Sequence, residues 1–201
     1  NWQNIRRKKN WYFESISLYN NLDHVALILD GNKRWAKKNK KSKISGYSKG
    51  FENIKNLVKS SLSINLPNLT VFALSSENYK RSSINIIYQI IYDNFSKILE
   101  ELIKENGVKI KIFGERKNLP QKIIDIFDEI ENLSINNKSL NLNIAFNYGF
   151  KNEIKQVLEK VKKDSSININ NNKRIKELFL LGNIKDPDIL IRTGGKNRLS
   201  N

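Results

Sequence analysis

The sequence predicts an α/β fold: a single domain with one mostly parallel sheet flanked by helices. Three observations support this prediction. From residue 24 onward, short apolar runs of strand length alternate with longer patterns of helical period. Polar clusters follow three of the apolar runs, as expected at the carboxyl edge of an open sheet. The length, 201 residues, is enough for one substantial core.

The strand candidates are short runs rich in valine, isoleucine, leucine and phenylalanine. The first apolar run, Val25 to Leu29, is continuous, which is typical of a buried strand. Because helical patterns separate the candidates, the strands are expected to run mostly parallel. The predicted strands are His24–Leu29, Asn68–Ser75, Lys109–Gly114, Leu140–Phe146 and Asp188–Arg192.

Helical patterns fill the intervals between the strands. They cover about 46–63, 84–106, 120–134 and 151–163, with a shorter pattern near 172–181. Asn106-Gly107 is typical of a helix end, and Pro120 suits a first helical turn. The pattern at 84–106 repeats apolar residues every three or four positions. Core packing alone explains this face, and the alternative is that one edge of it lines an apolar channel.

The chain is predicted to divide into a leader and one domain. Residues 1–22 form a basic, aromatic leader, and residues 23–201 form the domain. A basic cluster beside aromatic residues can lie at a membrane surface, and the alternative is a helix packed on the domain. No apolar run of the sequence approaches the length that spans a bilayer.

The composition excludes some classes of site. The sequence has no cysteine, which excludes disulfides and thiolate metal sites, and its one histidine, His24, excludes a histidine-rich zinc site. The net charge is +16. A general bias toward lysine, asparagine and isoleucine explains most of this charge. The functional alternative is attraction to anions such as diphosphates, acidic lipid or nucleic acid.

The segment after the first predicted strand carries the strongest functional signal. In an open α/β sheet, ligands bind beyond the carboxyl ends of the strands, so Asp30 stands where a metal ligand is useful. Gly31 and Asn32 lead into a helix start, whose free N–H groups attract phosphate. Lys33 and Arg34 add positive charge. The segment therefore predicts a site for a magnesium-bound diphosphate.

Two further polar clusters follow predicted strands. The second strand is followed directly by hydroxyl, carboxylate, amide and guanidinium groups, those of Ser75, Ser76, Glu77, Asn78 and Arg81. The fifth strand ends in a glycine turn between two arginines, with the order Arg192, Thr193, Gly194, Gly195, Arg198 and Ser200. Arginine forks match phosphate oxygens, and a glycine turn lets backbone N–H groups approach an anion. Because all three clusters line one edge of one sheet, we expect Asp30, Asn78 and Arg192 to converge there.

Five stretches of the chain share their order and spacing with one known family. They are HVALILDGNKRWAKK (24–38), ISGYSKGFENIKNL (44–57), LTVFALSSENYKRS (69–82), LNLNIAFNYG (140–149) and DILIRTGGKNRLSN (188–201). In these stretches the chain resembles the cis-prenyltransferases, which include undecaprenyl and dehydrodolichyl diphosphate synthases. The resemblance implies condensation of isopentenyl diphosphate with an allylic diphosphate such as farnesyl diphosphate. It also implies a long-chain polyprenyl diphosphate product and an apolar tunnel for the growing chain.

The resemblance implies a role for each matching residue. Asp30 matches the family's ligand for Mg²⁺ and, with Asn78, is expected to be catalytic. Arg192, Arg198 and Ser200 match the site for isopentenyl diphosphate. The remaining substrate-binding matches are Gly31, Asn32, Arg34 and Lys43 near the allylic diphosphate, Ser75 near the reacting carbons, and Trp35 and Arg81.

The sequence departs from the family's pattern at several positions. Tyr47 stands where many members carry a histidine near the diphosphate, and Lys33 replaces a common bacterial glycine and resembles the eukaryotic members. The resemblance also calls for a second metal carboxylate downstream of Asp30. The sequence is therefore expected to be incomplete at its C-terminus and catalytically poor by itself.

Two other functions compete with this interpretation. A non-catalytic partner subunit of a prenyltransferase complex would lack the metal-aspartate motif, so Asp30-Gly31-Asn32 favours the catalytic type. A nucleic-acid-binding module is disfavoured because the basic residues are dispersed and show no recognised motif. The resemblance further implies a homodimer or a heteromer with a related subunit, and peripheral membrane contact. The expected location is the cytosolic face of the endoplasmic reticulum or the cytoplasm, with organelle targeting left open.

Overall fold

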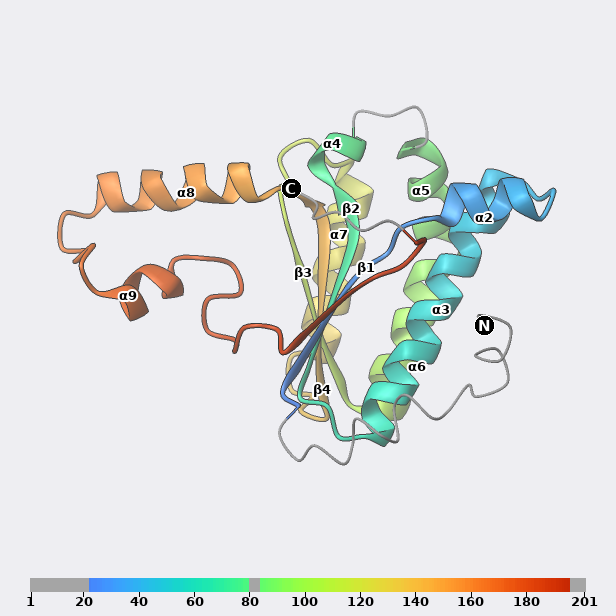
Figure 1. Cartoon of the computed structure of the whole chain (residues 1–201), viewed down its shortest axis with the longest axis horizontal. Helices are drawn as coiled ribbons and strands as arrows, with labels where there is room; N and C mark the ends of the chain where they lie inside the picture. Colours follow the sequence, from blue (N-terminus) through green and yellow to red (C-terminus); the bar gives the residue numbers. More distant parts are fainter. Residues whose placement is uncertain (1–21, 80–83, 196–201) are drawn as a thin grey trace.

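Five parallel strands form one sheet in the order β3-β4-β2-β1-β5 (Figure 1). The computed structural model describes residues 22–79 and 84–195. The strands are β1 His24–Ile28, β2 Asn68–Ser75, β3 Val108–Phe113, β4 Leu140–Tyr148 and β5 Ile189–Arg192. The predicted strands are confirmed, with small differences at their ends. Because β1 lies between β2 and β5, the polar segments that follow these three strands are neighbours in space.

Most helices lie where the sequence pattern predicts them. Their bounds are α2 Asn32–Lys38, α3 Lys43–Ser63, α4 Ser76–Tyr79, α5 Ile84–Ile90, η2 Ile91–Phe95, α6 Ser96–Asn106, α7 Gln121–Ser134, α8 Phe150–Lys163 and α9 Asn172–Glu177. The short helix α4, directly after β2, was not predicted. The predicted helix at 84–106 is not one continuous α-helix, because the π-helical segment η2 separates α5 from α6. A π turn holds more residues than an α turn and therefore rotates the residues that follow it. The last predicted helix is shorter than expected and ends at Glu177.

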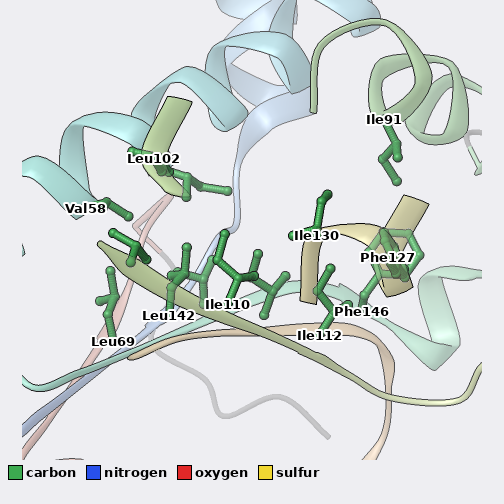
Figure 2. Close-up of a cluster of buried hydrophobic side chains, with 14 of the residues drawn as sticks. Val58, Leu69, Ile91, Leu102, Ile110, Ile112, Phe127, Ile130, Leu142 and Phe146 are labelled. Carbon is green, nitrogen blue, oxygen red and sulfur yellow. The ribbon is translucent and has the colours of Figure 1, made fainter. Parts of the chain in front are cut away.

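The core lies on one face of the sheet. In the central strands Leu27, Val71 and Ile144 are register partners, and all three side chains are buried. They face the apolar sides of α3, α6 and α7, which supply Val58, Leu102 and Phe127 (Figure 2). Removing such side chains from water is the main stabilising term, about 1.5–3 kcal/mol for each residue. This layer fixes the positions of the strand ends that carry the polar segments.

The opposite face of the sheet is more polar. Thr70 and Asn143 are register partners there, and the Thr70 hydroxyl lies 2.7 Å from Nε2 of His24. Helices α8 and α9 extend away from the sheet on this side (Figure 1). No helix within the described residues is both long enough and apolar enough to cross a membrane.

Strand β5 is held in register by the residue that precedes it. A carboxylate oxygen of Asp188 accepts hydrogen bonds from the backbone N–H groups of Asp23 at 2.8 Å and His24 at 2.9 Å. Nζ of Lys185 lies 3.1 Å from the other oxygen. The resulting register pairs Ile28 with Arg192, so these contacts determine where the last side chain of β5 lies.

The contacts of Asp188 predict a pH-dependent contribution to stability. Hydrogen bonds from the backbone of His24 and Asp23, together with Lys185, lower the pKa of Asp188 from 3.8 to about 2. Since the folded-state pKa is depressed, this stabilisation is present above pH 3.8 and is lost as the pH falls toward 2. In urea titrations, Asp188→Asn should unfold at lower denaturant concentration than wild type at neutral pH, and the difference should shrink in acid. A difference independent of pH would contradict this assignment.

Candidate active site

The site is built around the carboxylate of Asp30, at the end of β1. Its Oδ2 accepts hydrogen bonds from Nη2 of Arg192 at 2.8 Å and from Nε at 3.3 Å. Its Oδ1 lies 3.1 Å from Nη2 of Arg34, on the first turn of α2. The side chain of Asp30 is 25% exposed, so solvent and ligands reach it. The predicted meeting of the first and last polar clusters is therefore confirmed.

Thr193 joins the backbones of these two segments. Its hydroxyl accepts the N–H of Asp30 at 2.9 Å and donates to the carbonyl oxygen of Asp30 at 2.7 Å. Its own N–H donates to the carbonyl oxygen of Ile28 at 3.1 Å. Thr193 was not among the site residues predicted from the sequence. The signal that could have found it is its place directly after Arg192, where a short hydroxyl side chain can bond to backbone.

Two glycines permit the close approach of the segments. Gly31 and Gly194 have φ angles of 102° and 81°, in the region that favours glycine. A Cβ on Gly194 would lie 2.7 Å from the carbonyl oxygen of Asp30 and 2.7 Å from Nη2 of Arg34. A Cβ on Gly31 would lie 3.0 Å from Cα of Gly194. The glycine turn after β5 therefore packs directly on the segment that carries Asp30.

Asn32 is positioned by the packing of α2 on α3. Helix α3 has two buried glycines one helical turn apart, Gly46 and Gly50, and both lie against Asn32. A Cβ on Gly46 would lie 2.5 Å from the backbone oxygen of Asn32, and a Cβ on Gly50 would lie 2.7 Å from its Nδ2. Side chains larger than glycine at these positions would push Asn32 away from the edge of the sheet.

A hollow of about 320 Å³ opens beside Asp30. It is lined by Asp30, Asn32, Lys33 and Arg34 on one side and by Asn78 on another, with Tyr47, Ala73 and Ile87 among its apolar neighbours. The predicted convergence of Asp30, Asn78 and Arg192 at one edge is thus confirmed. A smaller pocket, of about 30 Å³, shares Asn32 and the apolar part of this lining and continues among Phe51, Ile54 and Phe146.

The other predicted site residues have different positions. Ser75 is buried, and its hydroxyl accepts the N–H of Asn78 at 3.2 Å, so it orients the backbone of α4. Trp35 lines a second hollow of about 380 Å³, which reaches α3 and the Gly194 turn and shares Asp30 and Asn32 with the first. Lys43 begins α3, is exposed, and lines none of these three hollows. Arg81, Arg198 and Ser200 lie outside the described residues.

Asp30 remains ionised at this position. Partial burial opposes ionisation, but the hydrogen bond from Arg192 and the charges of Arg34 and Arg192 outweigh it and lower the pKa of Asp30. The site therefore presents a carboxylate over the whole neutral pH range. It also has two guanidinium groups within reach of any anion bound there.

The donor set fits a hard cation that shares its ligands with a substrate. No group of three or more histidine, cysteine, aspartate or glutamate side chains in the described part of the chain could hold a metal ion. Asp30 supplies one carboxylate, and the amides of Asn32 and Asn78 line the same hollow. Mg²⁺ is commonly bound by one or two carboxylates, with waters and substrate phosphates completing the octahedron. The residues present suit that arrangement and not an all-protein cage.

Comparison with known proteins agrees with this geometry. The sequence profile of the family described as "Putative undecaprenyl diphosphate synthase" matches residues 28–201. The chain is 36% identical over 188 residues to an isoprenyl transferase of Thermotoga maritima, covering 89% of this chain and 78% of that protein. It is 35% identical over 192 residues to a tritrans,polycis-undecaprenyl-diphosphate synthase (geranylgeranyl-diphosphate specific) of Pyrobaculum aerophilum, with 89% and 78% covered.

A solved structure shares the architecture. Lavandulyl diphosphate synthase from Lavandula x intermedia, in complex with dimethylallyl diphosphate, superposes with a TM-score of 0.82 at 27% identity. The match covers 89% of this chain and 80% of that one. The profile match, the relatives and the shared fold agree with the resemblance found in the five motifs. The chain therefore belongs to the undecaprenyl diphosphate synthase family of cis-prenyltransferases, which are enzymes that transfer prenyl groups.

Proposed function

We propose that this enzyme condenses isopentenyl diphosphate with an allylic diphosphate and makes a long-chain polyprenyl diphosphate of the dolichol or undecaprenol type. The observation that carries the proposal is the cluster of Asp30, Arg34 and Arg192 beside a hollow that also contains Asn78. A carboxylate for a hard cation and two guanidinium groups are the groups that bind diphosphates. The names of the relatives support the same substrate class.

The residues of the site are proposed to have separate roles in the reaction. Arg34 would hold the allylic diphosphate, and Arg192, with Arg198 and Ser200, would hold isopentenyl diphosphate. Mg²⁺ held by Asp30 would supply charge stabilisation for the departing diphosphate. As the allylic C–O bond breaks and the new C–C bond forms, negative charge grows on the departing diphosphate, and fixed guanidinium groups stabilise it. A proton then leaves the isopentenyl unit, and oxygens of the substrate phosphates can accept it.

The growing chain is proposed to extend into the apolar pocket behind the diphosphate hollow. The two share Leu29, Tyr47, Ala73 and Ile87, so a chain held at the hollow already touches apolar side chains. Ala73 leaves space at this junction because its side chain is a single methyl group. The apolar face of the α5 region, for which a channel was the alternative to core packing in the sequence, supplies Ile87.

The partners are proposed from the exposed apolar surface and from the charge. Leu190 on β5 and Leu158 on α8 are 53% and 62% exposed, which supports a homodimer or a heteromer with a related subunit. The basic, aromatic leader, residues 1–22, supports peripheral membrane contact, although 1–21 lie outside the described residues. Lys33 is a basic residue at a position where the chain resembles the eukaryotic members of the family. This resemblance supports the cytosolic face of the endoplasmic reticulum as the location.

A direct assay tests the proposed function. The purified full-length gene product is incubated with radiolabelled isopentenyl diphosphate, Mg²⁺, and either dimethylallyl, farnesyl or geranylgeranyl diphosphate. We expect labelled prenyl products that depend on the allylic substrate and disappear when EDTA removes the cation. Product chain length, read by thin-layer chromatography after dephosphorylation, identifies the product class. A folded protein that consumes no label with any allylic substrate, alone or with a related subunit, would contradict the proposal.

A further inference from the structure

The carboxylate of Asp30 is already engaged by two arginines. Arg192 contacts Oδ2 and Arg34 contacts Oδ1, so each carboxylate oxygen has a guanidinium partner. We infer that these arginines occupy both oxygens of the Asp30 carboxylate, so that a divalent cation binds there only together with a diphosphate. The inference rests on the proposed function, because it assigns the diphosphate as the group that draws the two guanidinium groups away from Asp30.

Electrostatics disfavour a cation on the free site. An ion beside Asp30 would gain one carboxylate, but it would lie close to the positive charges of Arg34 and Arg192. Lys33 lines the same hollow and adds a third positive charge. Like charges a few ångströms apart repel strongly at the edge of a protein, where the effective dielectric constant is well below that of water. The attraction of one carboxylate therefore does not offset the repulsion between the metal ion and the positively charged side chains around it.

A diphosphate reverses this balance. It carries several anionic oxygens, and arginine binds phosphate through paired, charge-assisted hydrogen bonds of the kind it makes with a carboxylate. When Arg34 and Arg192 turn to a diphosphate, lone pairs of Asp30 become available to the cation. Further ligands then come from the diphosphate itself, in the manner typical of Mg²⁺ sites.

The two arginines are not equivalent in this role. The side chain of Arg34 is 46% exposed and contacts Asp30 through one nitrogen, whereas that of Arg192 is 14% exposed and contacts it through two. The partly buried, two-point contact is screened less by water and salt. Arg192 should therefore hold Asp30 more strongly, and Arg34 should exchange more readily.

Mn²⁺ binding to the full chain tests the inference, with inorganic pyrophosphate as the diphosphate probe. Water-proton relaxation distinguishes protein-bound Mn²⁺ from the Mn²⁺–pyrophosphate complex in solution, which is measured separately without protein. Wild type should bind Mn²⁺ weakly alone and at least about tenfold more tightly with pyrophosphate. Arg192→Gln, which removes one nearby charge, should raise the Mn²⁺ affinity of the free protein about tenfold. Arg34→Gln should raise it less.

Two controls make the result specific. Arg174→Gln removes an arginine on α9 that is paired with Glu177 and lies outside the site, and should leave Mn²⁺ binding unchanged. Asp30→Asn should remove the Mn²⁺ binding assigned to the site. Thermal unfolding shows whether each variant is folded. If Arg192→Gln is not folded, Arg34→Gln tests the same inference.

The outcomes separate the inference from the function on which it rests. Equal Mn²⁺ affinity of wild type with and without pyrophosphate, or no gain in the folded arginine variants, would overturn the inference even if prenyl transfer is normal. Absence of prenyl transfer in a wild-type protein whose Mn²⁺ binding depends on pyrophosphate would instead contradict the proposed function. A gain of Mn²⁺ affinity in Arg192→Gln that Asp30→Asn abolishes would support the inference.

Discussion

Asp30→Asn should reduce prenyl transfer by at least about a hundredfold in kcat while the protein stays folded. The substitution keeps the size of the side chain and, among the described residues, removes the only negative charge that lines the hollow. Without it, the site loses its carboxylate ligand for the cation, and loss of one preorganised group that stabilises charge typically costs about 10²–10³ in kcat. The measurement is steady-state turnover of radiolabelled isopentenyl diphosphate at saturating allylic substrate.

Stability and a matched control complete this experiment. The carboxylate of Asp30 is partly exposed and its ion pairs with Arg34 and Arg192 are near the surface, so its loss should change unfolding free energy by about 1 kcal/mol or less. Asp186→Asn is the control, because Asp186 is highly exposed and pairs with Lys176 away from the hollow. It should turn over at the wild-type rate. Near-normal turnover in Asp30→Asn would refute the assignment of Asp30.

The second large effect is a separation of the two substrates by mutation. Arg192→Ala should raise KM for isopentenyl diphosphate about 10- to 100-fold, since a hydrogen bond between charged groups is worth about 1.5–3 kcal/mol. Arg34→Ala should act mainly on KM for the allylic diphosphate and on kcat. Both KM values are measured by varying one substrate at saturation of the other.

Because Arg34 and Arg192 both contact Asp30, the control must distinguish the loss of a positive charge anywhere on the protein from its loss at the site. Arg174→Ala removes the same charge on α9 and should leave both KM values unchanged. Identical effects of Arg34→Ala and Arg192→Ala on the two substrates would show that the site is divided wrongly. In that case the arginines would act together on one diphosphate.

Much of the fold could be predicted because its signals are local. The strands of this sheet are buried apolar runs, and the periodic helices between them leave parallel crossovers as the natural connection. The π-helical segment Ile91–Phe95 was not predicted, since its apolar spacing fits a continuous helix equally well.

For the site, the sequence by itself determined which residue types follow each strand and that the ends of parallel strands share one edge. That was enough to expect Asp30, Asn78 and Arg192 together, because strand direction and side-chain alternation are local properties. It could not show that Asp30 is bonded to both Arg34 and Arg192, or that Thr193 ties their backbones together.

Only the tertiary structure decided these contacts. They depend on the order of the strands, which places β5 beside β1, and on the register set by Asp188. They also depend on two glycines, Gly31 and Gly194, whose missing side chains let the segments touch. Residues separated by 162 positions meet through packing and register over the whole sheet, and that information is not present in any local pattern.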